Sequence, residues 1–406
     1  MRFVKKCLIL IAMDIQLKLI ELLKKKGTGE TMGKSLLSED LAILPGLFKN
    51  PEGHLTTKAT LAAALLMLSP TPEEALFIKQ IQTYLPDSLT QLFFGAPQTA
   101  FETLIQQVLK QNDLNAEEMK MGINATLDPA IPEYLKAVFL EAERLKRETE
   151  TENTACYDIL YQKATHTSVH VPLLIDLSNG YDGLNRTPYS TLYLAPLLAS
   201  IGFPTVLHGT HEVAPKRGEN AHKLLKLAGK NPLQSLQKCK EELEESQIGW
   251  TYIDQAISFP ELHQLTELRA NMVKRPILAT VEKLLQPMIA TGQNYLVTSY
   301  THPPYKEKMI AILRHQNRYD KNLLFRGQEG SIQLPMDRPA RYLVIDKTTV
   351  EEDFVKSSNF KDPLIYMATT ILKKLNLEPN RDIEADLTHS IETGLAQAHF
   401  ERALND

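Results

Sequence analysis

The chain has 406 residues, of which 43% are hydrophobic and 23% are charged. This length allows two domains and a sizeable buried core, and the composition is that of an ordinary soluble globular protein. The 45 basic and 49 acidic side chains give a net charge of −4. The charge of the whole chain therefore offers no argument for nucleic acid as a partner, although a local basic face is compatible with it.

The cysteines and the N-terminal residues bear on the cellular location. The cysteines are Cys7, Cys156 and Cys239. They lack the spacing of metal ligands or of a disulfide framework, which suits a reducing compartment and predicts a cytoplasmic protein. The apolar run after the basic first residues is short and is interrupted by Asp14, which predicts neither secretion nor a membrane span. Met13 is an alternative start, with residues 1–12 as an upstream extension.

Residues 15–161 predict helices throughout. Thr71–Glu74 (T-P-E-E) is typical of a helix start, because proline is tolerated in the first turn and the acids oppose the helix dipole. Asn115–Glu118 starts a later helix. We interpret this loose repetition as an internal duplication. One helical module covers residues 1–100, and a second module with a linker covers residues 101–162.

The pattern changes after a charged run, Glu143–Thr154, which we interpret as a solvated helix end and linker near a domain boundary. From about Thr165 strands alternate with helices, which predicts parallel βα units in an α/β domain over residues 163–406. The expected strands are 249–253, 294–300, 322–326 and 341–345, and the expected helices are 219–228, 305–315, 363–375 and 383–404. Ser258–Glu261 reads as a capping box. The helix that it opens is expected to carry His263, Arg269, Lys274 and Arg275.

The stretch from Val169 to Gly218 is the candidate functional region. An apolar strand, 170–177, leads into the polar turn Ser178–Gly183. A helix follows, which we expect Thr187 to cap with Pro188 at its first position, and then a second strand, 203–207.

Two glycines of the turn, Gly180 and Gly183, permit close approach of a ligand. Free N–H groups at the start of the following helix favour an anion there. The pattern therefore predicts a phosphate site, with an ordinary strand-to-helix turn as the alternative.

This order of motifs resembles the anthranilate phosphoribosyltransferase family (glycosyltransferase family 3) and its nucleoside-phosphorylase relatives. There the turn reads G-T-G-G-D-G, the helix opens N-x-S-T, and the second strand ends K-H-G-N before a Ser/Lys/Gly loop. The matching residues here are Gly180, Asp182, Gly183, Ser190, Thr191, His208, Gly209, Lys216 and Gly218. The likeness continues in Thr280–Pro287, Tyr300–Pro303 and Phe325–Gly327, and so covers most of the chain.

The resemblance implies a small all-helical N-terminal domain and a larger α/β domain with a mostly parallel central sheet, with a cleft between them. It also implies a homodimer that transfers a phosphoribosyl group from phosphoribosyl pyrophosphate (PRPP) to an amine with the help of magnesium. Such a reaction needs N–H donors, cations and metal, because charge accumulates on the departing pyrophosphate.

The resemblance also implies where substrate and metal bind, but it assigns no catalytic residue. The implied substrate- and phosphate-binding residues are Asn179, Gly180, Asp182, Gly183, Arg186, Ser190, Thr191, His208, Gly209, Lys216, Lys274 and Arg275. The implied magnesium ligands are Ser190 and Glu329.

The sequence departs from the family pattern at positions that matter for chemistry. Tyr181 stands at a glycine position, where a ring can block a phosphate or the ribose. Leu207 replaces the lysine and Thr210 the asparagine of K-H-G-N. Glu329 is the only acid where the family has an Asp-Glu pair for magnesium. Lys216 is a candidate to replace the missing cation, or else a solvated surface lysine.

These departures are similar to those of a divergent branch of the family that is associated with nucleic-acid binding. Lys283–Pro287 (K-L-L-Q-P) and Gly327–Gly330 (G-Q-E-G) fit that branch. Two hypotheses follow. The first is a pentosyltransferase that uses PRPP and an acceptor other than anthranilate. The second is a non-catalytic homologue that binds single-stranded nucleic acid or a nucleotide in the same cleft. An inert scaffold for protein partners stays open as a third.

Overall fold

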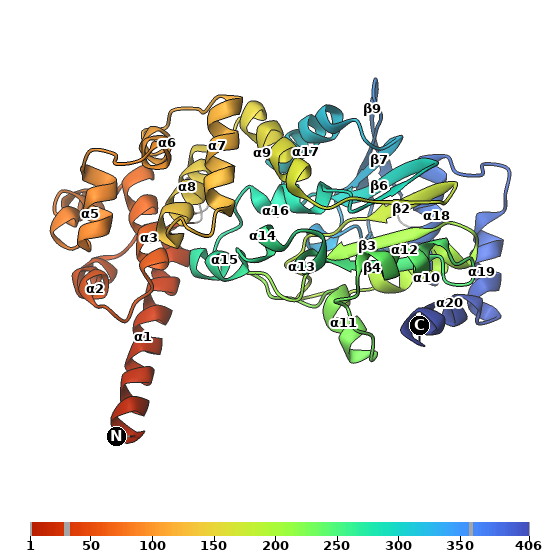
Figure 1. Cartoon of the computed structure of the whole chain (residues 1–406), viewed down its shortest axis with the longest axis horizontal. Helices are drawn as coiled ribbons and strands as arrows, with labels where there is room; N and C mark the ends of the chain where they lie inside the picture. Colours follow the sequence, from red (N-terminus) through yellow and green to blue (C-terminus); the bar gives the residue numbers. More distant parts are fainter. Residues whose placement is uncertain (1, 28–32, 357–359, 406) are drawn as a thin grey trace. The chain divides into compact units, whose positions relative to one another are not determined.

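The structure is a computed structural model that describes residues 2–27, 33–356 and 360–405, with the backbone alone for residues 2–13. The chain divides into two compact units (Figure 1). The helical unit is Met1–Ile159 with Leu265–Leu278, and the α/β unit is Leu160–Gln264 with Ala279–Asp406. The predicted fold class, a helical N-terminal part followed by a larger α/β part, is confirmed.

Some of the predicted organisation stays a prediction, namely the module bounds 1–100, 101–162 and 163–406 and the cleft. Leu265–Leu278, which the sequence pattern assigned to the α/β domain, packs in the helical unit. None of the helices in the described part of the chain combines the length and the apolar character that a membrane-spanning helix needs.

The helical unit is built around α3. Its helices are α1 (Arg2–Lys26), α2 (Ser38–Lys49), α3 (Leu55–Met67), α4 (Pro72–Ile78), η1 (Ile81–Thr83), α5 (Asp87–Phe94), α6 (Ala100–Leu109), α7 (Ala116–Leu127), α8 (Glu133–Lys146), most of α9 (Glu150–Lys163) and α15 (Thr266–Met272). α3 is buried along ten consecutive positions and packs against α1, α6 and α8. Its alanine-rich sequence leaves small side chains on every face, which lets helices approach it from several sides.

The two predicted helix starts in this unit are confirmed. The Thr71 hydroxyl accepts a hydrogen bond from the Glu74 backbone N–H, and the Glu74 carboxylate accepts one from the Thr71 N–H, at 3.2 and 2.9 Å. Asn115 and Glu118 form the same reciprocal pair at 3.0 and 2.9 Å. Each pair satisfies N–H groups that the first turn of a helix leaves without intrahelical partners.

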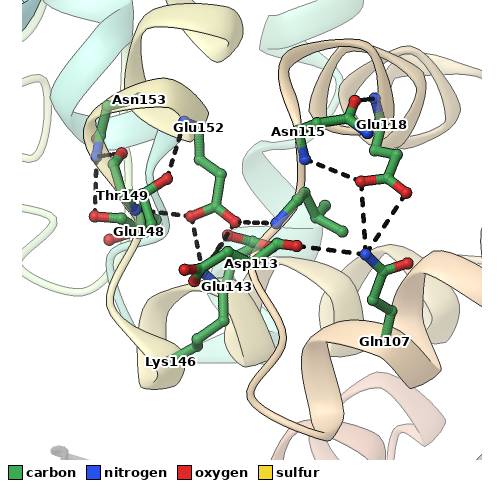
Figure 2. Close-up of polar contacts among 11 residues, drawn as sticks. Gln107, Asp113, Asn115, Glu118, Glu143, Lys146, Glu148, Thr149, Glu152 and Asn153 are labelled. Atoms are coloured by element: carbon green, nitrogen blue, oxygen red, sulfur yellow. Dashed lines mark hydrogen bonds and ion pairs between the residues drawn. The ribbon is translucent and has the colours of Figure 1, made fainter.

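The interpretation of the charged run as a solvated linker is wrong. Glu143 and Glu152 have no exposed surface, and Figure 2 shows the polar contacts around them. The Glu152 carboxylate accepts hydrogen bonds from Lys146 Nζ and from the backbone N–H groups of Leu114 and Thr149, all at 2.7 Å. The turn between α8 and α9 is therefore folded over a buried ionic cluster, because its acids find partners inside the unit instead of in water.

The α/β unit contains a seven-stranded sheet with the order β4-β3-β2-β6-β7-β8-β9. The strands are β2 (Leu173–Leu177), β3 (Thr205–Gly209), β4 (Trp250–Asp254), β6 (Gln293–Ser299), β7 (Lys321–Phe325), β8 (Ala340–Ile345) and β9 (Val350–Val355). The first five are parallel to one another, β8 is antiparallel to β7, and β9 is antiparallel to β8. β1 (Thr167–Val169) and β5 (Met288–Ala290) form a separate parallel pair. The four strands expected from the sequence after residue 218 are present as β4, β6, β7 and β8.

Alternate residues of the central strands belong to two apolar cores. Ile175 and Leu177 contribute to the core formed with α10 and α18, whereas Leu174 belongs to the core formed with α12. The helices and turns of the unit are α10 (Thr191–Ser200), α11 (Ala221–Leu227), α12 (Leu236–Glu244), α13 (Gln255–Ser258), α14 (Pro260–His263), α16 (Leu278–Val281), η2 (Glu282–Leu284), α17 (Pro303–Gln316), η3 (Gln328–Gly330), α18 (Pro363–Leu375), α19 (Ile383–Glu392) and α20 (Leu395–Asn405). Burial on both faces explains why these strands read as continuous apolar runs.

Two helix expectations are corrected. Ser258 ends α13 and does not cap α14, since its hydroxyl donates to the Asp254 carbonyl oxygen at 3.4 Å. The single helix expected after it is broken, with α14 ending at His263 and α15 beginning at Thr266. The tail helix expected over 383–404 is likewise two helices, because Gly394 adopts a left-handed conformation (φ 74°) between them.

Candidate anion-binding site

The candidate site lies at the carboxyl ends of the parallel strands, where the strand order reverses between β2 and β6. From β2 the chain moves outward through β3 to β4, and from β6 it moves in the opposite direction through β7. Ligands of open α/β sheets bind at such a reversal, because the loops after the two strands diverge there. Two segments meet at this place: the turn and loop 178–191 after β2, and the segment Gly327–Gln333 after β7.

The ring of Tyr181 fills the part of the site next to His208. The Tyr181 hydroxyl lies 2.6 Å from His208 Nδ1, and His208 Nε2 lies 2.9 Å from Asp176 Oδ1. Asp176 Oδ2 in turn accepts a hydrogen bond from the Tyr319 hydroxyl at 2.8 Å. The remaining hollow of about 10 Å³ is lined by residues that include Asn179, Gly180, Tyr181, Tyr189, His208, Gly209 and Tyr252. This space holds about one water molecule.

Asn179 ties the turn to both neighbouring segments. Its side-chain Nδ2 donates to the Tyr189 hydroxyl at 3.1 Å, and its side-chain Oδ1 accepts from the Ile332 N–H at 2.9 Å. Burial raises the pKa of Tyr189 to about 12, partly offset by this bond to Asn179. Asn179 thus positions the turn from a buried place, and its polar groups are occupied by the protein.

The two glycines of the turn differ in whether their position requires a residue without a side chain. Gly183 adopts φ 74°, and a Cβ there would lie 2.5 Å from the Glu219 carbonyl oxygen. At Gly180 the nearest atom to such a Cβ, apart from chain neighbours, is Asp182 Oδ1 at 3.4 Å. Gly183 is therefore required by the backbone, whereas Gly180 keeps its side-chain face open.

We expect Gly183→Ala to lower the free energy of unfolding by about 2–4 kcal/mol, because it combines left-handed strain with a backbone clash. Gly180→Ala is the matched control and should change it by less than about 1 kcal/mol. Urea unfolding of the full chain measures both. Equal effects of the two substitutions would contradict the assignment.

The loop before α10 binds an anion, and that anion is a carboxylate side chain of the protein itself. The backbone N–H groups of Asn185, Arg186 and Thr187 donate to the Glu329 carboxylate at 3.2, 2.7 and 2.9 Å. The Thr187 hydroxyl donates to the same carboxylate at 3.1 Å. Partial burial raises the pKa of Glu329, but these hydrogen bonds outweigh burial and lower it to about 2. We call the three N–H groups of Asn185–Thr187 the amide nest.

The two predicted cations beside the nest have different surroundings. Lys216 Nζ donates to the carbonyl oxygens of Gly183 and Glu329 at 3.0 and 2.9 Å, and lies 3.9 Å from Asp182 Oδ1. Arg186 keeps 82% of its side chain exposed, with Nε 3.8 Å from Glu329 Oε2. Lys216 is therefore bound to the loops, and Arg186 is the cation that faces solvent.

The expected capping of α10 is wrong in detail. The helix begins at Thr191, and the Thr187 hydroxyl binds Glu329 instead of the helix N-terminus. The Ser190 N–H donates to Gln333 Oε1 at 2.9 Å, and the Thr191 hydroxyl donates to the same oxygen at 3.4 Å. The Tyr189 N–H donates to Glu219 Oε1 at 3.0 Å. The chain's own side chains thus occupy the N–H groups of Tyr189 and Ser190, just before the helix start that we expected to face a phosphate.

The predicted basic pair, Lys274 and Arg275, belongs to the helical unit. Lys274 Nζ donates to the Lys24 carbonyl oxygen at 3.2 Å. Burial, and next the nearby charge of Arg144, lower the pKa of Lys274 to about 8. A contact of either residue with phosphate stays a proposal.

Glu329, one of the two predicted magnesium ligands, does not fit the ion in this arrangement, and Ser190 as a ligand stays a prediction. Both oxygens of Glu329 accept hydrogen bonds from the amide nest, so the carboxylate is occupied. Among the residues that the structure describes, no group of three or more histidine, cysteine or acidic side chains is placed to hold a metal ion. Magnesium prefers a carboxylate together with water and substrate oxygens, and Glu329 would first have to leave the nest.

Sequence reasoning missed three residues of this region. Lys283 is buried, and its Nζ donates to the Ser299 carbonyl oxygen. Burial lowers the pKa of Lys283 to about 8, while the charges of Asp182 and Glu282 oppose that change. The K-L-x-x-P motif pointed to Lys283. No sequence signal pointed to Glu219 and Gln333, whose role depends on how distant segments meet.

Comparison with known proteins extends the resemblance noted from the motifs. Residues 102–164 match the helical bundle domain of the glycosyl transferase family. An anthranilate phosphoribosyltransferase of Aeropyrum pernix is 23% identical over 313 residues, which cover 74% of this chain and 88% of that protein. An uncharacterized protein of Aquifex aeolicus is 27% identical over 277 residues, or 68% of this chain and 82% of that one. The chain is therefore similar to anthranilate phosphoribosyltransferases over most of its length.

Solved structures show the same fold. The anthranilate phosphoribosyltransferase of Thermus thermophilus aligns with a TM-score of 0.58 and 16% identity, over 74% of this chain and 98% of that one. The Saccharomyces cerevisiae enzyme in complex with PRPP and Mg aligns with a TM-score of 0.59 and 10% identity, over 75% of this chain and 97% of that one. The dimer and the cytoplasmic location stay predictions for this chain.

Proposed function

We propose that the protein binds PRPP at the amide nest and transfers its phosphoribosyl group to an acceptor other than anthranilate. The observation that carries the proposal is the convergence of three consecutive backbone N–H groups on one carboxylate, at the carboxyl ends of parallel strands. Such a geometry binds anions, and a phosphoryl group offers the same kind of acceptor oxygens. The relatives named anthranilate phosphoribosyltransferase support PRPP as the anion.

In this proposal the residues around the nest act on the charge of PRPP. The N–H groups of Asn185–Thr187 hold a phosphoryl group, and Arg186 pairs with it from the solvent side. Fixed donors of this kind stabilise the charge that develops on a leaving pyrophosphate, since they need no reorganisation during the reaction. The remaining proposed contacts are Asn179, Gly180, Asp182, Gly183, Ser190, Thr191, His208, Gly209, Lys216, Lys274 and Arg275. No step of the proposal passes through magnesium.

Arg186→Ala tests the assignment. We expect the affinity for PRPP, measured by calorimetry with and without Mg²⁺, to fall about 5- to 20-fold, because a charge-assisted contact to a phosphate is lost. The matched control is Arg314→Ala, which removes the same charge from an exposed position of α17. Absence of PRPP binding by the wild type, or equal effects of the two substitutions, would contradict the proposal. A product assay with a panel of aromatic amines then identifies the acceptor.

One observation favours a second candidate function, binding of a nucleotide or single-stranded nucleic acid without transfer. Tyr181 leaves a hollow of only about 10 Å³, whereas a sugar ring needs far more room. This arrangement suits a phosphate bound at the nest while its sugar stays outside. PRPP binding without product from any acceptor, together with salt-sensitive retention of an oligonucleotide, would favour this candidate over transfer.

A further inference from the structure

The amide nest is closed by an internal competitor. We propose that the nest is a site for a single phosphoryl group and that Glu329 is a tethered anion which a phosphorylated ligand must displace. This inference rests on the proposed function for the identity of the natural ligand, but not for the existence of the site.

The contacts of Glu329 are those of a bound anion. Its carboxylate receives three backbone N–H groups and one hydroxyl, all from Asn185–Thr187, which is far from Glu329 in sequence. Only 5% of the side chain is exposed. Four donors on one carboxylate are more than an ordinary surface acid finds, and they match the acceptor capacity of a phosphoryl group.

One segment closes both the amide nest and the N–H group of Ser190. Glu329 occupies the nest, and Gln333, four residues later, accepts from the Ser190 N–H at 2.9 Å. The segment is fastened by Lys216 Nζ on the Glu329 carbonyl oxygen at 2.9 Å and by the Ser299 hydroxyl on the Gly330 carbonyl oxygen at 2.6 Å. Movement of this single segment, Gly327–Gln333, would therefore free both the nest and the Ser190 N–H next to the start of α10.

The backbone of Glu329, the internal competitor, is strained. Glu329 adopts φ 51° and ψ 18°, a left-handed conformation that costs a residue with a side chain free energy. Gly330 follows at φ 80°, so the turn changes direction at two consecutive residues. Departure of Glu329 from the nest relieves this strain, which lowers the cost of displacement by a ligand.

A tethered carboxylate competes at a high effective concentration. The apparent affinity of a free anion is its intrinsic affinity multiplied by the fraction of molecules whose nest is open. Removal of the carboxylate should therefore strengthen anion binding. A magnesium ligand predicts the opposite sign, because its loss weakens binding of a phosphorylated substrate. The sign of the effect separates the two roles of Glu329.

The experiment compares Glu329→Ala with the wild type by calorimetry, with inorganic phosphate as the probe of the nest and PRPP as the probe of the proposed function. We expect Glu329→Ala to bind inorganic phosphate at least about 10-fold more tightly than the wild type. Glu329→Gln should lie between them, since its amide keeps one acceptor oxygen and loses the charge. Glu351→Ala is the control for net charge, because Glu351 is exposed on β9.

Each outcome decides one of the two proposals. Equal or weaker phosphate binding by Glu329→Ala overturns the proposal that Glu329 competes for the nest. The proposed function still stands in that case if PRPP binds. Tighter phosphate binding without PRPP binding supports the competitor and overturns the proposed function. Near-ultraviolet circular dichroism checks the fold of Glu329→Ala. If that variant is unfolded, Glu329→Gln decides, and phosphate binding no tighter than in the wild type overturns the competitor.

Discussion

Glu143→Gln should stabilise the protein, and increasingly so as the pH rises from 5 to 9. Neither oxygen of the Glu143 carboxyl has a hydrogen-bond partner among the described residues (Figure 2). Lys146 donates its hydrogen bonds to Glu152 and Asp113, and its Nζ stays 3.8 Å from Glu143. Burial, and next the charge of Glu152, raise the pKa of Glu143 to about 9. Glu143 is therefore protonated in the folded chain at neutral pH.

The sign of the pH dependence follows from proton binding. Between the unfolded pKa of about 4.3 and the folded pKa of about 9, the folded state holds one proton more than the unfolded state, so stability falls as pH rises. Each pKa unit corresponds to about 1.4 kcal/mol, and relaxation of the cluster reduces the total. We expect glutamine to gain about 2–4 kcal/mol over the wild type at pH 9 and little at pH 5.

The measurement is urea unfolding at pH 5, 7 and 9. Glu150→Gln is the matched control, because Glu150 is an exposed acid in the first turn of α9. Its difference from the wild type should not change with pH. A constant difference for Glu143→Gln over this range would show that the buried carboxyl is ionised and would refute its protonation in the folded chain.

Glu74→Ala should be the most destabilising single change in the helical unit. Glu74 and Lys26 are buried and form an ion pair at 2.9 Å, and Glu74 also accepts from the N–H groups of Leu36 and Thr71, both at 2.9 Å. Removal of the acid leaves a buried lysine and two backbone donors without their acceptor, which costs about 3–5 kcal/mol. The adjacent Glu73→Ala is the control, since its bond to the Ser38 hydroxyl is exposed and contributes at most about 1 kcal/mol.

Acid should reproduce part of this loss. Burial raises the pKa of Glu74, but the bonds from Leu36, Thr71 and Lys26 outweigh burial and lower it below the ordinary value. The stabilisation is therefore fully present above about pH 4.3 and is lost as the pH falls through the lowered folded pKa. Thermal unfolding of both variants and the wild type at pH 7 and pH 3 measures the two effects. Equal melting of Glu74→Ala and Glu73→Ala at pH 7 would contradict the assignment.

The fold was predictable where the pattern is local. Apolar runs located the central strands, and Thr71 and Asn115 marked helix starts, because a cap and its partner lie within one turn of each other. The charged run at Glu143 was misread, because its burial depends on a loop some thirty residues earlier at Asp113 and Leu114. Sequence pattern carries no signal for such a distant partner.

The candidate site was predictable in its backbone but not in its contents. The loop 178–191 was expected to present N–H groups to an anion, and it does so at Asn185–Thr187. The identity of that anion, Glu329, depends on the meeting of segments more than 140 residues apart. Glu329 was expected to hold magnesium, because the motif places it where the family has an acidic pair and says nothing about a left-handed backbone.

Our central claim is that the amide nest is a phosphoryl site and that Glu329 occupies it. The most direct measurement is a crystal structure of Glu329→Ala grown with pyrophosphate. We expect a phosphoryl group whose oxygens lie within hydrogen-bond distance, about 2.7–3.2 Å, of the N–H groups of Asn185, Arg186 and Thr187. A nest filled by water or by another side chain of the protein, with pyrophosphate bound elsewhere or absent, would contradict the claim.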